Sequence, residues 1–314
     1  MKYKISEPIL ITGSTGFIGS NLARKLISLK YDVHLILRKK SNLWRITDLL
    51  KFKNVKVHIC DLKNKKNINL IIKKLKPKTI FHLAAYGAYS FQNVKKNIQR
   101  NILEGSINLI DSCAENGFDR FINTGSNSEY GFKKKPMKES DVLDPNSYYA
   151  VCKSAVTNYS RYLSLSENLP ITTVRPFHVY GPYEEKTRLI PTLIGKLLKN
   201  QKIDLVSPKI SRDLLFIDDS VDLFCRIAEK KIQNGKIYNM GSGNQTTIKV
   251  IANTVKDLTS SESILNWNKM QNRSWDQEIW ISDMSLVKKD LNWNHKYNIV
   301  KGLKKTIAWY KKNN

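Results

Sequence analysis

Three glycines, Gly13, Gly16 and Gly19, follow one another at a spacing of three residues directly after a short apolar segment at residues 8–12. The segment is too short for a helix and is typical of a buried parallel strand. Glycines at this spacing allow a tight turn, close approach of the backbone to a pyrophosphate, and close packing of the following helix on the strand. We therefore predict a dinucleotide-binding loop; a glycine turn without a ligand is the alternative. The residues predicted to contact the cofactor here are Gly13, Thr15, Gly16, Phe17, Ile18 and Gly19.

Apolar runs of strand length recur along the first 176 residues and are separated by segments of helical character. Strands that alternate with helices at this spacing form a parallel sheet covered by helices on both faces. The fold class we predict is α/β, with a doubly wound parallel sheet of the Rossmann type. The predicted strands lie at residues 8–12, 32–37, 55–59, 79–84, 121–124 and 170–176, and the predicted later helices lie near residues 97–116 and 147–167.

The regular alternation ends after residue 176. The remaining segments predict a helix at residues 190–198, strands at residues 212–219 and 237–243, and a last helix near residues 300–310. We predict a dinucleotide-binding domain at residues 1–176, to which segments near residues 212–240 return. Residues 177–314 are expected to form mainly a smaller C-terminal substrate-binding region.

The chain carries 53 Lys and Arg against 27 Asp and Glu, a formal net charge of +26. Only 11 of the 53 basic residues are Arg, so 42 are Lys, and they are spread along the whole chain. Proteins that read nucleic acids cluster their basic residues and favour Arg at base edges, so a nucleic-acid partner is not expected. The charge indicates a solvated, Lys-rich surface that attracts anionic small molecules.

The sequence gives no sign of a membrane segment or a metal site. No apolar run approaches the roughly 18 residues of a membrane-spanning helix, and no apolar stretch precedes Pro8 as in a signal peptide. The four cysteines, at positions 60, 113, 152 and 225, form no C-x-x-C pair, so neither a disulfide framework nor a zinc site is indicated. We predict a soluble, cytoplasmic protein without a bound metal or a membrane partner.

The end of the second predicted strand bears on which dinucleotide binds. An acidic residue there holds a free ribose 2′-hydroxyl, whereas an Arg accommodates a 2′-phosphate. The sequence at this point is Arg38-Lys39-Lys40, and a guanidinium can bind phosphate through two hydrogen bonds and stack beside adenine. Arg38 therefore favours NADP(H) over NAD(H), although Lys39 and Lys40 also fit the general excess of Lys.

Tyr149 and Lys153 form a Y-x-x-x-K pair in the helix predicted near residues 147–167, where a spacing of four places both side chains on one face. A nearby ammonium favours the phenolate, so this tyrosine can exchange a proton with a sugar oxygen while hydride moves at the carbon. Two other Tyr–Lys pairs have the same spacing, but only this one follows a glycine loop and a hydroxyl-rich turn. Ser126, in that turn, is predicted to bind the reacting oxygen; a local turn-forming hydroxyl is the alternative.

These residues and further motifs resemble one family over nearly the whole chain. They are similar to the extended short-chain dehydrogenase/reductases of the NAD-dependent epimerase/dehydratase type, which modify nucleotide sugars. The matching motifs are Gly13/Gly16/Gly19, Asp61-Leu62, His82-Leu83-Ala84-Ala85, Asn101, residues 126–131, Tyr149/Lys153, Arg175-Pro176 with Val179-Tyr180-Gly181-Pro182, Arg212-Asp213 with Asp218-Asp219, and residues 239–243.

The resemblance implies roles for further residues. Asp61 and Leu62 would flank the adenine of the cofactor. Ala84 and Ala85 would line the cofactor groove, with Asn101 also at the cofactor. Tyr149 and Lys153 would contact the cofactor as well, and Lys153 would hold the nicotinamide ribose. The resemblance places substrate contacts at Ser128, His178, Arg212 and Arg273.

In this resemblance, Arg212 and Arg273 would hold the diphosphate or the ribose of a nucleotide-sugar substrate, a suitable task for permanently charged side chains. The resemblance also implies a homodimer, formed through the helices near residues 97–117 and 147–167.

The resemblance leaves the reaction itself open. The 4,6-dehydratases of the family carry an Asp-Glu pair directly after the position of Ser126, because elimination of water needs an acid and a base. This chain has Asn127 and Ser128 there, and Glu129 one residue further, where a shifted turn would be needed to bring it into the site. Residues 175–182 look more like those of CDP-abequose synthase and related 4-keto-sugar reductases.

Arg38 and the missing Asp-Glu pair favour an NADPH-dependent reductase of a nucleotide-linked 4-keto-6-deoxyhexose. Hydride would go to C4, Tyr149 would protonate the new alkoxide and Ser126 would hold the oxygen. The alternatives are a nucleotide-sugar 4-epimerase, or a 4,6-dehydratase, with tightly bound NAD. A last alternative is a non-catalytic NADP-binding interaction protein.

Overall fold

The computed structural model describes residues 3–89, 91–271 and 278–313. The chain divides into two compact units. The first comprises Met1–Gly131, Val142–Pro176 and Val221–Tyr238, and the second comprises Phe132–Asp141, Phe177–Ser220 and Asn239–Asn314. The elements, in chain order, are β1 (Ile9–Thr12), α1 (Phe17–Ser28), β2 (Val33–Leu37), β3 (Val55–Ile59), α2 (Lys65–Leu75), β4 (Thr79–His82), α3 (Lys95–Gln99), the π-helix η1 (Arg100–Glu104), α4 (Gly105–Asn116), β5 (Arg120–Thr124), the 3₁₀-helix η2 (Asn127–Tyr130), α5 (Tyr148–Ser166), β6 (Ile171–Pro176), β7 (His178–Tyr180), α6 (Leu189–Leu197), β8 (Ile203–Asp204), β9 (Ser211–Phe216), α7 (Ile217–Glu229), β10 (Ile237–Met240), β11 (Gln245–Thr247), α8 (Ile248–Thr259), β12 (Leu265–Asn266), α9 (Ser285–Leu291) and α10 (Ile299–Asn313).

A seven-stranded sheet forms the centre of the first unit, in the strand order β10-β6-β5-β4-β1-β2-β3. The β1 strand pairs in parallel with both β2 and β4, and the pairs β2–β3, β4–β5 and β5–β6 are also parallel. The chain runs outward from β1 to β3 and then returns to β4, so the strand order reverses between β1 and β4. Ligands bind beyond the carboxyl ends of the strands at such a point.

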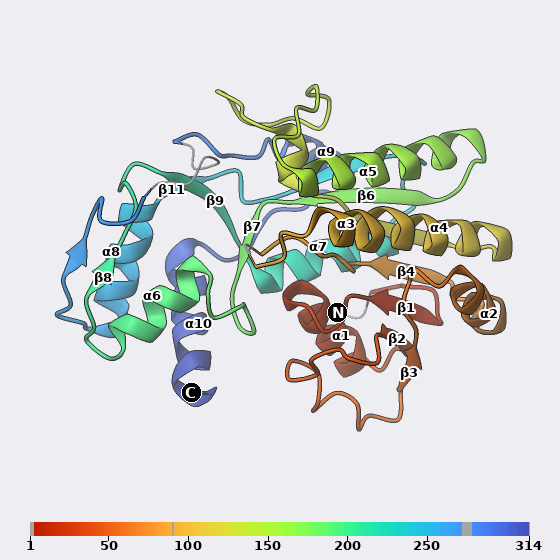
Figure 1. Cartoon of the computed structure of the whole chain (residues 1–314), viewed down its shortest axis with the longest axis horizontal. Helices are drawn as coiled ribbons and strands as arrows, with labels where there is room; N and C mark the ends of the chain where they lie inside the picture. The colour runs from red at the N-terminus through yellow and green to blue at the C-terminus, as the bar shows by residue number, and fades with distance from the viewer. Residues whose placement is uncertain (1–2, 90, 272–277, 314) are drawn as a thin grey trace. The chain divides into compact units, whose positions relative to one another are not determined.

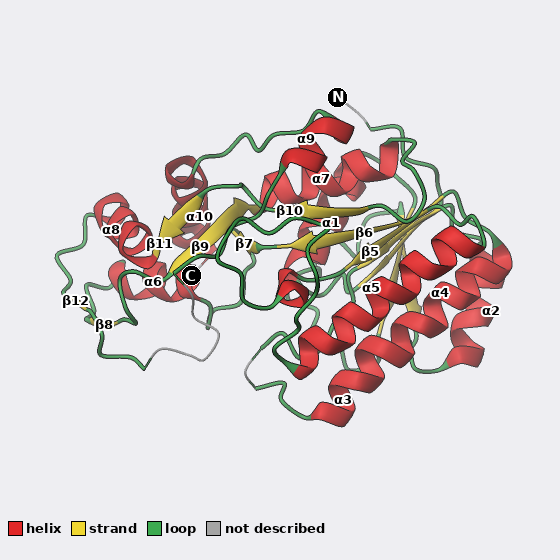
Figure 2. Cartoon of the chain, turned by 90° about the horizontal axis from the view of Figure 1, so that it is seen from above, coloured by secondary structure: helices red, strands yellow, loops and turns green. Residues whose placement is uncertain are grey.

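Helices cover both faces of this sheet, as predicted. Figure 2 shows α2, α4 and α5 on one face and α1 and α7 on the other, and Figure 1 shows the order in which the chain visits them. All residues of β1, β2 and β4 are buried, which explains why these strands are almost continuously apolar. The predicted fold class, an α/β doubly wound parallel sheet, is confirmed.

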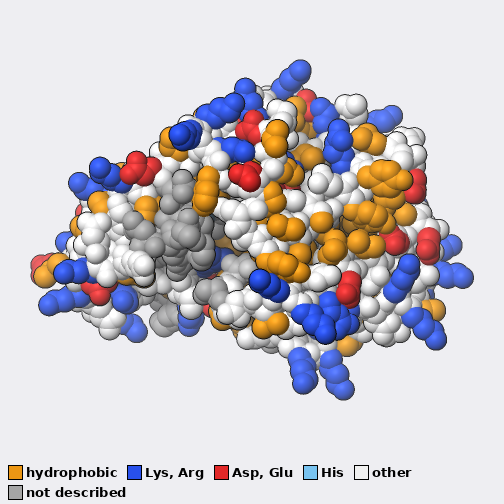
Figure 3. All heavy atoms as spheres, turned by 45° about the horizontal axis from the view of Figure 1, so that its top comes forward, with side chains coloured by type: hydrophobic (Ala, Val, Ile, Leu, Met, Phe, Trp, Pro, Cys, Tyr) orange, Lys and Arg blue, Asp and Glu red, His pale blue; other side chains and the backbone are white. Residues whose placement is uncertain are grey.

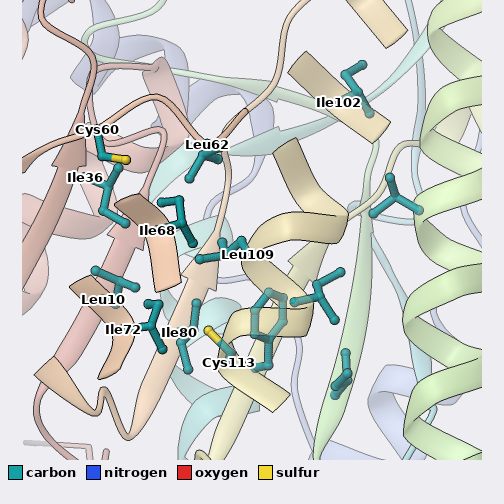
Figure 4. Close-up of a cluster of buried hydrophobic side chains, with 14 of the residues drawn as sticks. Leu10, Ile36, Cys60, Leu62, Ile68, Ile72, Ile80, Ile102, Leu109 and Cys113 are labelled. Carbon is teal, nitrogen blue, oxygen red and sulfur yellow. The ribbon is translucent and has the colours of Figure 1, made fainter. Parts of the chain in front are cut away.

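The core between the sheet and α2, α4 and α5 is a single apolar cluster (Figure 4). Leu10 and Ile80 reach it from neighbouring strands, Ile72 from α2 and Leu109 from α4, and all four are completely buried. On the opposite face, the ring of Phe224 in α7 packs edge-on against Phe81 of β4, with 6.3 Å between the ring centroids. The two packed faces hold the carboxyl ends of the strands in one fixed arrangement.

The second unit has its own small sheet, in which β9 lies between β11 and β7 (Figure 1). Asp213 of β9 is completely buried and connects this sheet to two loops. Its carboxylate accepts the backbone N–H groups of Ser242 at 2.7 Å, Gly243 at 3.2 Å and Ser282 at 2.9 Å. Several charge-assisted bonds to one buried carboxylate fix both loops against β9.

The described residues contain no membrane-spanning helix, no metal-binding cluster and no disulfide. None of the helices formed by these residues is both long and apolar enough to cross a membrane. The described His, Cys, Asp and Glu side chains form no group of three that could hold a metal ion. The four cysteines are all buried and none is in a disulfide.

Candidate active site

The glycine loop joins β1 to α1 and lies close to the backbone that follows β4. Gly13 has a φ of +74°, and a Cβ on it would lie 2.5 Å from the carbonyl carbon of Leu83, just after β4. A Cβ on Gly19 would lie 2.3 Å from the carbonyl oxygen of Gly13. Both contacts are far shorter than a side chain tolerates, so the loop adopts this course only with glycine at these two positions.

The N-terminus of α1 opens from this loop with its N–H groups uncapped by any side chain. Its N-cap residue is Gly16, and the first turn, which contains Phe17 and Ile18, has no acidic residue. The hydroxyl of Ser14 is buried and has no hydrogen-bond partner among the described residues. An uncapped helix N-terminus attracts anions through its free N–H groups and its dipole. The loop residues therefore fit the pyrophosphate of a dinucleotide.

A pocket of 670 Å³ lies at the ends of β2 and β3. Its lining comprises Arg38, Lys39, Lys40, Ile59, Cys60, Asp61, Asn64 and Asn67. The one acidic residue among them is already engaged, because Asp61 accepts the N–H of Lys63 at 3.0 Å and pairs with its ammonium at 3.2 Å. The rest of the lining is cationic, amide or apolar, and it suits an anionic group next to a flat ring.

The other predicted cofactor residues lie around the same edge of the sheet. Ala84 follows β4, and its N–H donates to the hydroxyl of Thr12 at 3.3 Å. Ala85 is exposed and Leu62 is buried. Asn101 lies in the π-helical segment η1 and donates to the carbonyl of Asn97 at 2.7 Å. A π-helical turn inside a helix is rare and is frequent at functional sites.

Tyr149 and Lys153 lie in α5, which begins at Tyr148 after the N-cap residue Ser147. The ammonium of Lys153 lies 6.0 Å from the centroid of the Tyr149 ring. It also donates to the carbonyl oxygen of Thr124 at 2.7 Å, at the end of β5. The structure thus brings the Tyr–Lys pair to the turn that carries Ser126, two residues after Thr124.

Burial sets the chemistry of this lysine. Lys153 is only 5% exposed, and this desolvation lowers its pKa to about 8, while the negative charge of Glu129 acts in the opposite direction. An amine with a pKa near neutral pH exchanges its proton readily and still supplies a positive charge at pH 7. That charge favours the phenolate of the neighbouring Tyr149, so the pair can pass a proton to and from a bound oxygen atom.

Ser126 is the N-cap of the 3₁₀-helix η2, and its hydroxyl oxygen accepts the N–H of Ser128 at 3.1 Å. The hydroxyl therefore keeps its own hydrogen for another acceptor. Glu129, by contrast, is completely buried and paired with Arg175 at 2.8 Å. The turn is not shifted so as to present Glu129 as a free acid or base, and the two positions after Ser126 hold the uncharged Asn127 and Ser128.

Three of the predicted substrate residues, His178, Arg212 and Arg273, belong to the second unit. His178 lies in β7, and burial together with the cations Arg212 and Arg188 holds its pKa well below the usual range, so the ring is neutral. Arg212 lies in β9 and donates to the carbonyl of Ser211 at 2.8 Å. Arg273 lies outside the described residues.

The sequence did not indicate two buried side chains of the second unit, Trp280 and Glu184, each of which has a polar atom without a described partner. Trp280 is 6% exposed, its ring packs edge-on against His178 at 6.1 Å, and its N–H has no partner among the described residues. Burial raises the pKa of Glu184 to about 8, and its Oε2 also lacks a described partner. An isolated Trp or Glu carries no pattern of its own, so no sequence signal marked these side chains.

The chain matches the model of one protein family and is similar to many known proteins. The model of the family described as "NAD dependent epimerase/dehydratase family" matches residues 9–241. The chain is 28% identical to the trifunctional UDP-glucose 4,6-dehydratase/UDP-4-keto-6-deoxy-D-glucose 3,5-epimerase/UDP-4-keto-L-rhamnose-reductase of Arabidopsis thaliana, over 97% of this chain and 47% of that protein. The chain thus spans about half the length of that relative.

A full-length relative and a solved structure are also similar. The UDP-glucuronate 4-epimerase of Thermodesulfobacterium geofontis is 28% identical, over 97% of this chain and 96% of its own length. The crystal structure of a UDP-glucose 4-epimerase from Thermotoga maritima with UDP-glucose superposes with a TM-score of 0.88 at 23% identity, covering 97% of this chain and 98% of that one. At this identity the structure establishes the likeness of the folds.

Proposed function

Because the chain belongs to the NAD dependent epimerase/dehydratase family, we propose that it is a nucleotide-sugar 4-epimerase that retains its dinucleotide cofactor. The family membership confirms the family and the enzyme class that the sequence predicted. The closer likeness to CDP-abequose synthase stays a prediction. The names of the relatives, among them 4-epimerases and 4,6-dehydratases, support the epimerase alternative better than the reductase that we favoured from the sequence.

One observation carries the proposal: Tyr149 and Lys153 lie at the turn that carries Ser126, and the two residues after Ser126 are Asn127 and Ser128 rather than an acidic pair. A 4-epimerase needs one group that takes the proton of a sugar hydroxyl and returns it to the same oxygen. A 4,6-dehydratase also needs an acid and a base to remove water. Glu129, the only nearby candidate in η2, is buried and paired.

The bound dinucleotide supplies reversible hydride transfer at the sugar carbon. The phenolate of Tyr149 takes the proton from the hydroxyl at that carbon and gives it back at the end of the cycle. The ammonium of Lys153 stabilises the phenolate, and the hydroxyl of Ser126 holds the reacting oxygen by a hydrogen bond. Electrostatic stabilisation of this kind works best in a buried site, and Lys153 and Ser126 are 5% and 7% exposed.

We propose NADP(H) as the preferred dinucleotide, in a family described by its dependence on NAD. The support is the pocket at the ends of β2 and β3, which presents Arg38, Lys39 and Lys40. Asp61, the one acidic residue in its lining, is already paired with Lys63. A 2′-phosphate would meet three cations there, whereas a free ribose 2′-hydroxyl would find no uncommitted carboxylate among the described lining residues.

We also propose a homodimer, formed through the helices near residues 97–117 and through α5. The outer face of α5 carries the exposed apolar side chains Val151, Tyr162 and Leu165, and Figure 3 shows hydrophobic side chains gathered on this face of the first unit. A contiguous exposed apolar patch often marks a protein–protein interface. We further propose that residues 177–314 bind most of the nucleotide sugar, through His178 and Arg212, with Ser128 contributing from η2.

The experiment incubates the purified protein with UDP-, dTDP-, CDP- and GDP-linked hexoses and, in separate samples, with the corresponding 4-keto-6-deoxyhexoses and NADPH. The sugar at C4 is followed by proton NMR, and the absorbance of NADPH is recorded in parallel. The proposal expects a C4 epimer to accumulate to equilibrium without any net change in NADPH. Stoichiometric NADPH oxidation with a 4-keto sugar would instead establish the reductase. A 4-keto-6-deoxy product would establish the dehydratase.

A further inference from the structure

The buried carboxylate of Glu129 connects three elements of the first unit. Its Oε1 accepts the backbone N–H of Ser126 at 2.7 Å and the hydroxyl of Thr157 at 3.1 Å. Its Oε2 accepts Nε of Arg175 at 2.8 Å. Ser126 belongs to the turn after β5, Thr157 to α5 and Arg175 to β6. One carboxylate therefore ties the turn directly to a helix and to a strand.

The helical contact is made on the face that bears the proposed catalytic pair. Thr157 follows Lys153 by four residues, and Lys153 follows Tyr149 by four, so the three side chains lie in one row along α5. Thr157 and Glu129 are completely buried. The bond between them thus sets how close the Ser126 turn lies to the row that begins with Tyr149.

Close neighbours confine the Glu129 carboxylate on both sides. A Cβ on Gly125 would lie 2.5 Å from Oε1 of Glu129 and 3.1 Å from the hydroxyl of Thr157, so this residue must be glycine for the bonds to form. On the other side, the guanidinium of Arg175 lies 4.6 Å above the Tyr130 ring. A buried ion pair adds little net stability compared with apolar side chains of the same size, and one use that proteins make of such pairs is to fix a unique geometry.

We propose that Glu129 and Thr157 are positioning residues, which hold the Ser126 turn in register with the face of α5 that carries Tyr149 and Lys153. Neither residue acts on the substrate. The inference rests on the proposed function, since Ser126 and Tyr149 serve one oxygen atom only if their separation is fixed. Misplacement of a reacting group by about 1 Å can cost on the order of a hundredfold in rate.

Besides its hydrogen bonds to the Ser126 turn and to α5, Glu129 has an electrostatic effect on Lys153. Its negative charge raises the pKa of Lys153 against the effect of burial. Glu129→Gln keeps an oxygen acceptor for Ser126 and Thr157, but it removes the charge and the ion pair with Arg175, and the lost charge lowers the pKa of Lys153. Thr157→Val keeps the charge and removes only the hydrogen bond to the helix. The two substitutions therefore change different quantities.

The experiment compares Thr157→Val, Thr157→Ser and Glu129→Gln with the wild type, and uses Thr172→Val as the matched control. Thr172 is a buried threonine of β6, so its change measures the general cost of exchanging a buried hydroxyl for a methyl group. Three quantities are recorded: kcat and KM, the dependence of kcat on pH, and hydrogen–deuterium exchange of a peptide covering residues 124–131.

We expect Thr157→Val to lower kcat about tenfold or more while KM changes less than about twofold, because the substrate still binds beside a misplaced turn. Exchange in residues 124–131 should become faster, and Thr157→Ser should restore both quantities. Glu129→Gln should move the alkaline limb of the kcat profile to lower pH. Thr172→Val should change neither the exchange nor kcat.

Two results would overturn the inference. If Thr157→Val had the kcat and the hydrogen–deuterium exchange of the wild type, the bond between Thr157 and Glu129 would not hold the Ser126 turn. An equal loss of activity in Thr172→Val would mean that any lost hydroxyl in this core has the same effect. If the wild type converts no nucleotide sugar, the proposed function fails, but the exchange measurement still decides whether Thr157 and Glu129 hold the Ser126 turn.

Discussion

The ammonium nitrogen of Lys153 lies 2.7 Å from the carbonyl oxygen of Thr124, the last residue of β5. This bond joins α5 to the carboxyl end of a central strand, where ligands bind in sheets of this kind. Because the same ammonium lies 6.0 Å from the centre of the Tyr149 ring, one lysine both anchors the helix and places a positive charge where it can stabilise a Tyr149 phenolate.

Replacing Tyr149 with Phe should remove the proton-transfer group and leave the fold intact. Loss of a general acid–base group costs about 10²- to 10⁴-fold in turnover, so kcat should fall by that order. Cofactor affinity, measured by titration of the dinucleotide, should change little. If affinity and turnover were lost together in a folded variant, Tyr149 would be a cofactor ligand before it is an acid–base group.

The pH dependence of kcat should reflect Lys153. Burial lowers its pKa to about 8, so the ammonium is present below that pH and is lost as the pH rises through it. With less positive charge beside Tyr149, kcat should decline above about pH 8. The measurement is kcat at saturating substrate between pH 6 and pH 10, with wild-type stability checked at each pH. A profile that stays flat to pH 10 would exclude the ammonium from catalysis.

Gly13 and Gly117 form a matched pair for testing the glycine loop. Both have a φ of +74°, but a Cβ on Gly13 would clash with the backbone after β4, whereas a Cβ on Gly117 would meet no atom within 4 Å. Gly117→Ala should therefore cost only the backbone strain, about 1–3 kcal/mol. Gly13→Ala should cost more than this in urea unfolding and should abolish dinucleotide binding. Equal costs for the two substitutions would mean that the close approach at Gly13 is unimportant.

Arg38→Ala tests the preferred dinucleotide. If a 2′-phosphate binds in the cationic pocket, this change should weaken NADP⁺ binding about 10- to 150-fold, since a charged hydrogen bond contributes about 1.5–3 kcal/mol. NAD⁺ binding should change by less than about twofold. Lys73→Ala, in α2 but outside the lining of the pocket, controls for the loss of one positive charge. Equal weakening of both dinucleotides by Arg38→Ala would contradict the NADP preference.

Local patterns in the sequence sufficed to predict the sheet and the residues at its edge. The strand at residues 55–59 matches β3, and that at residues 121–124 differs from β5 by one residue. Buried parallel strands are short and almost entirely apolar, and the glycine loop and the Tyr–Lys spacing are similarly local. The sequence did not indicate α2, where Lys and Asn dominate and only Ile68 and Ile72 are buried. The predicted strand at residues 212–219 ends at Phe216 and continues directly as α7.

The partners of buried polar residues could not be predicted. In the sequence, Glu129 lies one residue beyond the acidic pair of the 4,6-dehydratases and could be taken for a catalytic acid. Its actual partners, Thr157 and Arg175, lie 28 and 46 residues away. The π-helical turn at Asn101 likewise has no residue pattern of its own. Such features depend on contacts between segments that are far apart in the chain, and hydrophobic periodicity carries no information about them.

The most direct test of the proposed 4-epimerase uses a nucleotide hexose that carries deuterium at C4. The enzyme should interconvert the two C4 epimers and keep the deuterium at C4 in both, because hydride leaves and returns within one binding event. The measurement is proton NMR and mass spectrometry of both epimers after equilibration with catalytic amounts of enzyme and no added dinucleotide. Loss of the deuterium, or turnover that requires stoichiometric NADPH, would contradict the proposal.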